Sequence, residues 1–456
     1  MNPRNWALWR KGVVVGIVSA ITLFAPLASS MFAPGIPSVM KAFNTTNESL
    51  GTFCVSVYVL VFPHPRKTPF PRGPDRAHRP AISIPLGYQY ITVTLTRMFQ
   101  GFAAGPLLWA PMSEMYGRAA IFNLTNVLFI AFTLGCGFSN SMVTLIILRF
   151  FAGFNGSACL ALGGGVIADM IAPHQRGKAT AIWAIGPLLG PVIGPICGGF
   201  ISQRVGWRWI FYALAIGAFV VTLATFIFLK ETNPVILLEK KARKLRAETG
   251  NARLKSALET HVTGRHLIYL SLKRPFKLLF VSPIVLSLSI LMGINYGYLY
   301  LCFTTFPIVF QHVYDFSEGI SGLAYLGLGL GSLLGLALIG KYSDVIVVNM
   351  TVNSGVRKPE YRLPIMIFAN LCIPIGLFWY GWSADKQVHW IVPIIGSAVF
   401  GAGVLGTFMP ISTYLIDAFT IYAASALAAN SVLRSLMGAL LPLAGPAMVP
   451  NPVHFP

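Results

Sequence analysis

The chain has 456 residues, of which 55% are hydrophobic and only 11% are charged. Soluble domains have about 25% charged residues, so the composition excludes a soluble globular protein and indicates a polytopic membrane protein. The net charge of +20 is typical of nucleic-acid binders, but those gather their basic residues on one soluble surface. Here the basic residues lie between apolar segments, so we expect a lipid bilayer as partner and no nucleic acid.

Apolar segments of about twenty residues, the length that crosses a bilayer as a helix, recur along the chain. The first follows Arg4, Arg10 and Lys11 and lacks a clear signal-peptide cleavage site, so we interpret it as a retained span. The predicted spans are 12–32, 119–138, 143–168, 178–201, 208–229, 278–310, 319–340, 363–382, 390–412 and 421–448.

A further span is interrupted. Residues 50–60 and 101–113 are apolar, but residues 61–100 between them contain seven prolines and six Lys or Arg. Proline disrupts a helix and basic residues are costly inside a bilayer. The codons that could encode both ends of 61–100 fit splice signals, so we hypothesise a translated intron within the second span. A genuine basic loop between two half-spans is the alternative, and the spliced transcript distinguishes the two.

Charge divides the chain into three parts. Residues 230–277 contain twelve Lys or Arg and four Glu, which by the positive-inside rule places them in the cytoplasm, where they can also lie on anionic lipid. We therefore predict an N-terminal helical half (1–229, with 61–100 a non-native insert), a cytoplasmic central loop (230–277) and a C-terminal half (278–456). The last eight residues leave no room for another helix, so we expect this half to be truncated.

The residue patterns of common enzymes are missing from the sequence. There is no Ser/His/Asp set, phosphate-binding loop or zinc pair, and the six cysteines lie in apolar stretches without metal-binding spacing. We expect no enzymatic activity, no cofactor and no metal, and we interpret the cysteines as packing residues.

One segment, GPLLGPVIGPICGG at 186–199, sets glycine and proline at four-residue spacing inside a predicted span. Three prolines would break a soluble helix, at about 3 kcal/mol each, whereas a membrane helix tolerates them where neighbouring groups bond the freed carbonyls. The glycine stripe permits close approach of another helix, and a packing face without chemistry is the alternative interpretation. The residues of interest are Gly186, Pro187, Gly190, Pro191, Gly194, Pro195, Gly198 and Gly199.

This segment resembles the fifth-helix signature of drug:proton antiporters in the major facilitator superfamily. The wider resemblance, to the fungal-type group that includes multidrug and polyamine exporters, covers nearly the whole chain. It rests on NPRNW (2–6), SEMYGR (113–118), RFFAGFNGS (149–157), HQRGKA (174–179), WRWIF (207–211), KETNPVILLEKKARKLRAETGN (230–251), PEYRLP (359–364), PIGLFWYGW (374–382), YLIDAF (414–419) and AASALAANSVLRS (423–435). The resemblance implies an all-α fold of two six-helix halves, here with helix 2 interrupted and helix 12 missing.

Charged residues near span ends are candidates for gating. Glu114 and Arg118 are four residues apart and can pair on one helical turn, although a solvated pair of little energetic value is an equal alternative. Asp169 can pair with Arg118 or Arg176, or lie on the surface. Asp344 ends the eighth span at the place that corresponds to the 113–118 loop, which indicates two repeated halves.

Two arginines lie inside predicted spans. Arg149 resembles the fourth-helix arginine of the family, which implies a role in proton coupling, with snorkelling to the interface as the alternative. Arg434 lies well inside a span, where an unpaired charge is expensive, and Asp417 is a candidate partner. For the substrate cavity we predict Asn295, Tyr296, Tyr298 and Tyr300, which suit an amphipathic or cationic ligand; interhelical hydrogen bonding is their alternative use.

The sequence therefore predicts a monomeric transporter of small organic compounds such as drugs or polyamines, driven by proton exchange through alternating access. The plasma membrane is favoured over the vacuolar membrane. Proton-coupled uptake, facilitated diffusion, a nutrient sensor on the same fold and an inactive product of a faulty gene model are the alternatives.

Overall fold

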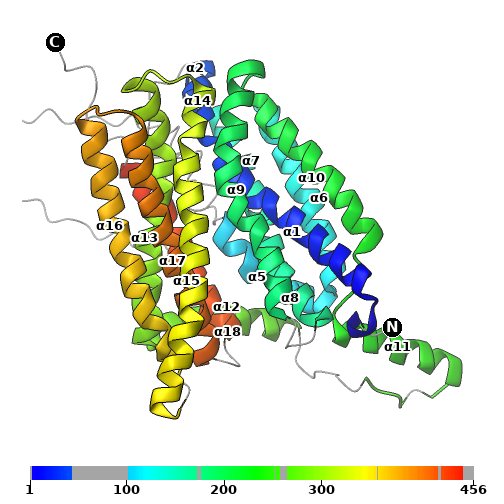
Figure 1. Cartoon of the computed structure of the whole chain (residues 1–456). Coiled ribbons are helices and arrows are strands. Elements are labelled where there is room, and N and C mark those ends of the chain that lie inside the picture. Colours follow the sequence, from blue (N-terminus) through cyan, green and yellow to red (C-terminus); the bar gives the residue numbers. More distant parts are fainter. Residues whose placement is uncertain are drawn as a thin grey trace, which may run out of the picture.

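The computed structural model of the chain describes residues 3–43, 101–171, 176–251, 253–256, 264–356, 358–419 and 423–444. The predicted insert at 61–100, the half-span at 50–60 and the last eight residues lie outside these ranges, so the intron hypothesis stays a prediction. Throughout the described residues the regular secondary structure is helical (Figure 1).

The first half of the chain contributes η1 (Pro3–Asn5), α1 (Leu8–Ser30), η2 (Ala33–Gly35), α2 (Ile36–Ala42), α5 (Gly101–Tyr116), α6 (Arg118–Gly137), α7 (Met142–Gly156), α8 (Ala158–Met170), α9 (Arg176–Val205) and α10 (Arg208–Phe228). The remainder contributes α11 (Pro234–Thr249), α12 (Gly264–Val281), α13 (Pro283–His312), α14 (Glu318–Leu323), α15 (Tyr325–Ser354), η4 (Pro359–Arg362), α16 (Leu363–Asp385), α17 (Ile391–Phe419), α18 (Ala423–Leu440) and η6 (Leu441–Ala444).

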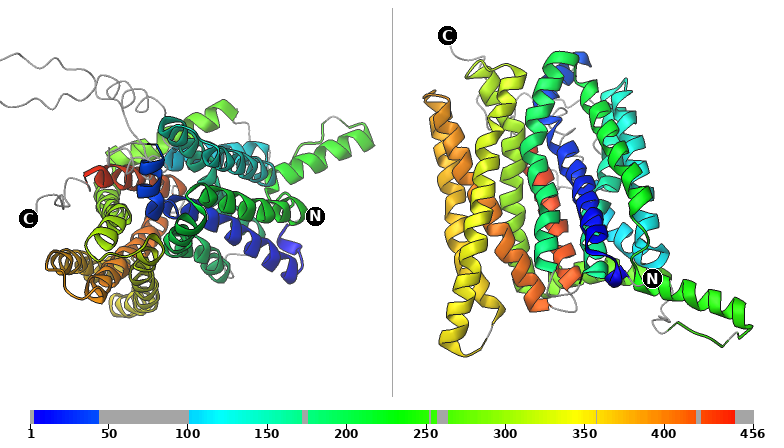
Figure 2. Two further views of the ribbon diagram at one scale, coloured as in Figure 1. Left: turned by 90° about the horizontal axis from the view of Figure 1, so that it is seen from above. Right: turned by 45° about the vertical axis from the view of Figure 1, so that its right-hand side comes forward.

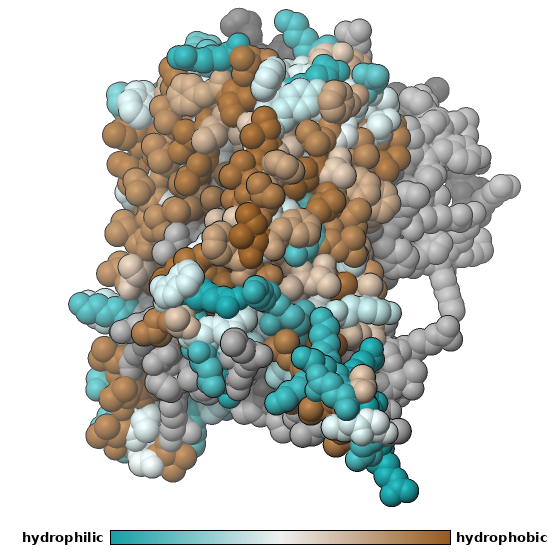
Figure 3. Space-filling model, turned by 90° about the vertical axis from the view of Figure 1, so that its right-hand side faces the viewer, coloured by the Kyte–Doolittle hydropathy of each residue, from teal (hydrophilic) through white to brown (hydrophobic). Residues whose placement is uncertain are grey.

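Within the described ranges, eight helical segments are long and apolar enough to cross a membrane, and α7 with α8 forms one of them, Met142–Met170. The molecular surface agrees with a lipid environment. Phe219, Leu223 and Phe226 share one face of α10 and are each more than half exposed, and an exposed apolar band of this kind indicates contact with membrane. Figure 3 shows such a face, apolar in its middle and hydrophilic at both ends.

Local sequence sets several helix ends. Predicted span 278–310 instead begins as α13 at Pro283, because the Ser282 side chain caps the helix and proline occupies its first turn. Predicted span 319–340 continues as α15 to Ser354, where Gly355 ends the helix in a left-handed conformation with φ of 70°. The sequence between 341 and 354 contains no helix breaker, so α15 extends beyond its apolar part.

The helices form two neighbouring bundles (Figures 1 and 2). α1 and α5 to α10 form one, and α13 to α18 form the other. α11 and α12 lie at the end of the molecule that holds the N-terminus. The basic residues of α11 therefore share this end with the N-terminus, as the predicted cytoplasmic face requires.

Candidate functional site

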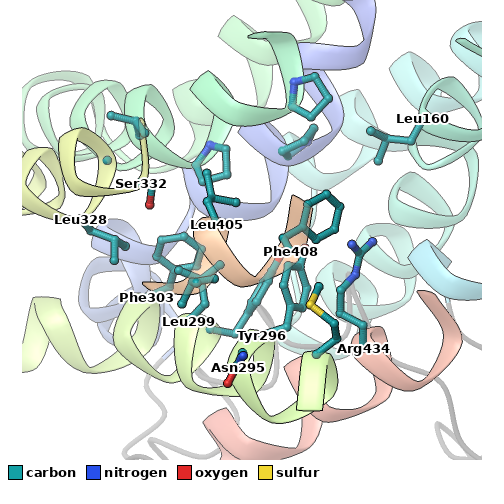
Figure 4. Close-up of a pocket in the computed structure, with 18 residues that line it drawn as sticks. Leu160, Asn295, Tyr296, Leu299, Phe303, Leu328, Ser332, Leu405, Phe408 and Arg434 are labelled. Atoms are coloured by element: carbon teal, nitrogen blue, oxygen red, sulfur yellow. The ribbon is translucent and has the colours of Figure 1, made fainter. Parts of the chain in front are cut away.

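A cavity of about 190 Å³ lies where the two bundles face each other (Figure 4). One side of its wall comes from α1, α8 and α9, and the other side from α13, α15, α17 and α18. The wall is largely apolar and aromatic. It consists of Pro26, Leu160, Pro187, Pro191, Val192, Met292, Asn295, Tyr296, Leu299, Tyr300, Phe303, Leu328, Gly329, Ser332, Val404, Leu405, Phe408 and Arg434.

Three of the four predicted cavity residues line this wall: Asn295, Tyr296 and Tyr300. Tyr298 does not, and it packs instead against the hydrophobic core. The wall residues of α13 recur at three- and four-residue steps, which place side chains on one helical face, and position 298 lies off that face. Pro187, Pro191 and Arg434, which the sequence singled out for other roles, also line the wall. The remaining wall residues were missed from the sequence, because their segments carry the same apolar composition as every span.

The polar groups that α13 brings to the wall also bond to neighbouring helices. The Asn295 Nδ2 atom donates to the Asn370 Oδ1 atom at 3.1 Å. The Tyr300 hydroxyl lies 2.8 Å from the Ser29 Oγ atom, a hydrogen bond that joins the two bundles. Interhelical bonding, the alternative use of these residues, therefore occurs together with cavity lining.

Arg434 reaches the cavity wall from the middle of α18. Its guanidinium carbon lies 4.9 Å from the ring centre of Tyr296 and 5.3 Å from that of Phe408. The predicted pairing with Asp417 is wrong, because Asp417 Oδ2 accepts a 2.7 Å hydrogen bond from Arg362 Nε. Asp417 lies near the end of α17 next to η4, too far along the helix to reach the cavity.

The Gly-Pro segment forms part of α9 and uses its two stripes differently. Pro187 and Pro191 line the cavity, whereas the glycine stripe packs on α1. An added Cβ at Gly190 would stand 2.9 Å from the Leu27 nitrogen. At Gly186 and Gly194 it would also overlap α1 atoms, and at Gly198 it would overlap the carbonyl of Met31, which caps that helix. The Trp183 carbonyl, which Pro187 leaves without a helical donor, accepts from Ser19 Oγ at 3.3 Å.

Arg149 is 2% exposed and lies inside the first bundle rather than on the cavity wall. Its guanidinium carbon is 4.5 Å from the Phe32 ring centre, and its Nη2 atom donates to the Ala28 carbonyl at 3.4 Å. Arg149 therefore connects α7 to α1 and does not snorkel to an interface.

At the end of the molecule that holds the N-terminus, Arg118 Nε donates to Asp169 Oδ2 at 2.6 Å, one of the two pairings left open for Asp169. The predicted Glu114–Arg118 pair is not formed among the described contacts: Glu114 is exposed, and its carbonyl accepts from Asn233 Nδ2 at 3.1 Å. Gly117 explains the difference, because its φ of 104° ends α5 before α6 begins, and four-residue pairing requires a continuous helix. The side chains of Arg176 and Asp344 lie outside the described part of the chain.

Glu231 completes the cluster around Arg118 and Asp169, and its role was missed from the sequence. Its carboxylate accepts from the backbone nitrogens of Arg118 at 3.0 Å and Ala119 at 3.3 Å, and from those of Thr232 and Asn233 at 3.0 and 2.8 Å. The first nitrogens of a helix lack internal acceptors and attract negative charge. Glu231 thus joins the segment after α10 to the start of α6.

Replacing Glu231 with alanine is expected to lower stability by about 1 kcal/mol, the usual effect of losing a helix cap. Thermal unfolding of the purified protein measures the change. Glu231→Gln keeps one acceptor oxygen, so its unfolding temperature should lie between those of the unmodified protein and Glu231→Ala. Glu248→Ala is the matched control, because Glu248 forms an exposed surface pair with Lys244, at 3.5 Å. Equal shifts for the two alanine variants would contradict the capping role.

Comparisons with known proteins decide the family. The model of the Major Facilitator Superfamily matches residues 18–442. The chain belongs to this superfamily. It is 47% identical to the MFS-type transporter penM of Penicillium rubens over 98% of the chain and 80% of the relative. It is 46% identical to the efflux pump radE of Floropilus chiversii over 97% of the chain and 75% of the relative.

Solved structures agree on the major facilitator fold. The inward-open structure of the xylose transporter XylE from E. coli superimposes with a TM-score of 0.65 at 16% identity, over 97% of this chain and 90% of that one. The chain is therefore an integral membrane protein that transports small molecules, not an enzyme, and it has the predicted major facilitator fold.

The two halves of this major facilitator protein also meet at the end opposite the N-terminus. α14 packs on α9 so closely that an added Cβ at Gly322 would stand 2.6 Å from the Pro195 carbonyl oxygen. The Gly319 nitrogen donates to Gln203 Oε1 at 2.9 Å, and Ser38 Oγ donates to Glu318 Oε1. These contacts join α14 to α9 and α2 at that end of the molecule.

Proposed function

We propose that this transporter exports small organic compounds in exchange for protons, with the two halves alternating around the central cavity. The observation that carries the proposal is that the Gly-Pro segment of α9, which resembles the antiporter signature, supplies Pro187 and Pro191 to the cavity wall. A relative that covers nearly the whole chain is named an efflux pump, which supports the outward direction.

Within this proposal, Arg118 and Asp169 form a cytoplasmic latch, and Arg149 transmits proton binding between α7 and α1. The chain works as a monomer in the plasma membrane, with residues 1–229 and 278–456 as its moving halves and residues 230–277 as their cytoplasmic connection. Asp344 and Asp417 belong to the cytoplasmic gate of the second half.

Proteoliposomes that contain a pH-sensitive dye test the exchange. Three naphthalene compounds serve as probes: 2-naphthalenesulfonate, 2-naphthalenesulfonamide and trimethyl(2-naphthyl)ammonium, and the first and last carry a permanent charge. With an acidic interior, uptake of a substrate should raise the internal pH, because protons leave as the substrate enters. A fall in internal pH would indicate symport, and uptake without any pH change would indicate facilitated diffusion; either result would contradict antiport.

Arg149→Ala should reduce this substrate-driven pH change at least tenfold. Arg208→Ala is the matched control, because the Arg208 guanidinium also lies over an aromatic ring, at 4.4 Å from the Trp207 centre, and donates to one carbonyl, that of Ser139 at 3.1 Å. Unchanged coupling in Arg149→Ala would remove Arg149 from the mechanism.

A further inference from the structure

The cavity wall has an unbalanced charge. Among the described residues that line it, Arg434 is the only charged one, and none is Asp or Glu. Figure 4 shows the Arg434 guanidinium next to Phe408 at one side of the cavity, with Ser332 at the other. A ligand in this cavity therefore meets a cation and no carboxylate.

Arg434 is also not neutralised by its surroundings. In the described part of the chain its Nε atom is buried without a hydrogen-bond partner, and Asp417, the acid expected from the sequence, is bonded to Arg362. The rings of Tyr296 and Phe408 attract the guanidinium through their π faces, but they accept none of its N–H groups in the way a carboxylate would. The charge remains available to a ligand.

The main polar neighbours on α13 are already engaged. Asn295 donates to Asn370, and Tyr300 shares a hydrogen bond with Ser29. A guanidinium presents a planar fork of donors that matches the oxygens of carboxylate, sulfonate or similar acids. It is therefore the group on this wall best suited to orient an acidic ligand.

The rest of the wall suits an aromatic body. Tyr296, Phe303 and Phe408 supply rings, and Pro187 and Pro191 supply a flat apolar surface opposite them. Aromatic groups pack favourably on such surfaces. We infer that the cavity selects amphipathic aromatic anions, with the acidic group on Arg434 and the ring system between the aromatic side chains and the prolines of α9.

This inference rests on the proposed function and narrows its substrate class. It also replaces the cationic ligand expected from the sequence, because the one charged group among the described wall residues is the Arg434 cation, which repels a polyamine or cationic drug, and no described wall carboxylate offsets it. An anion bound at Arg434 would fill a position whose charge, among the described contacts, is otherwise stabilised by the aromatic rings of Tyr296 and Phe408.

Calorimetric binding to the purified full chain in lipid nanodiscs tests the inference with the three naphthalene probes. The sulfonate should bind at least tenfold more tightly than the neutral sulfonamide, and the ammonium compound should bind most weakly. Arg434→Gln should abolish the preference, and Arg434→Lys should keep part of it. Arg208→Gln, which changes an arginine outside the cavity, should leave all three affinities unchanged.

Ser332→Asp provides a second variant that does not remove Arg434. It places a carboxylate on the opposite wall, and it should weaken sulfonate binding at least tenfold while improving binding of the ammonium compound. Equal affinities of the unmodified protein for all three probes would overturn the inference but leave the cavity as a binding site. If none of the probes bound, and none drove a pH change in proteoliposomes, both the inference and the proposed function would be overturned.

Discussion

Gly198→Ala is expected to destabilise the transporter by about 3 kcal/mol, the upper end of the usual effect of overpacking. Alanine in place of glycine normally stabilises a helix by about 1 kcal/mol. At Gly198, however, the added Cβ would overlap the backbone carbonyl of Met31, the residue that caps the end of α1. The added Cβ is fixed to the backbone of α9 and the Met31 carbonyl to the backbone turn that caps α1, so neither group is the end of a flexible side chain that can rotate away. Thermal unfolding and the yield of monodisperse protein measure the effect.

Gly164→Ala is the matched control. Gly164 lies in the middle of α8, and an added Cβ there would meet no heavy atom within 4 Å. The two substitutions change helix propensity equally, so their difference isolates the contact with α1. We expect the unfolding temperature to fall in Gly198→Ala and to stay unchanged or rise in Gly164→Ala. An equal change of unfolding temperature in both variants would refute close packing of α9 on α1.

Asp169→Asn is expected to lower stability by about 3 kcal/mol and to reduce transport at least tenfold. Removing one member of an ion pair that is largely shielded from solvent leaves the other charge without its partner, and the Arg118 and Asp169 side chains are partly buried, at 16% and 13% exposed. Thermal unfolding measures the effect on stability. The substrate-driven pH change in proteoliposomes measures the effect on transport.

A double variant, Arg118→Met with Asp169→Leu, distinguishes a structural pair from a functional latch. Apolar replacement of both members often restores stability, so this variant should regain most of its unfolding temperature but not its transport. Glu239→Gln is the surface control. A hydrogen bond from Arg243 is the main cause that holds the pKa of Glu239 below its ordinary value. This exposed contact lies on α11, away from the Arg118–Asp169 latch. Full transport by the double variant would argue against the latch.

The spans could be predicted because their signal is local: an apolar length that matches the bilayer. The same holds for the two stripes of α9, since four-residue spacing defines a helical face wherever the helix lies. Positions relative to other helices could not be predicted in this way. Asp417 was paired with Arg434 by its place along the sequence, but the nearest guanidinium in three dimensions comes from η4.

Two further differences between the prediction and the structure have physical causes that the length and hydrophobicity of the spans do not reveal. The Glu114–Arg118 pairing assumed a continuous helix, and the conformation of Gly117 separates the two residues into different helices. Glu231 lies in the 230–251 segment that carries the family resemblance, but its role was not predicted, because that role depends on where the segment after α10 returns to the start of α6. The charge of the cavity, likewise, depends on which faces of seven helices meet.

The prolines of α9 also give this helix a direction of flexibility. Pro187, Pro191 and Pro195 each remove a backbone hydrogen bond from one stripe, and helices bend most readily where such bonds are missing. The glycine stripe of α9 restrains the helix, because backbone contacts hold it against α1. α9 is therefore mechanically anisotropic: it can curve at the cavity wall while it stays fixed to its own bundle, so the shape of the cavity can adjust to ligands of different outline.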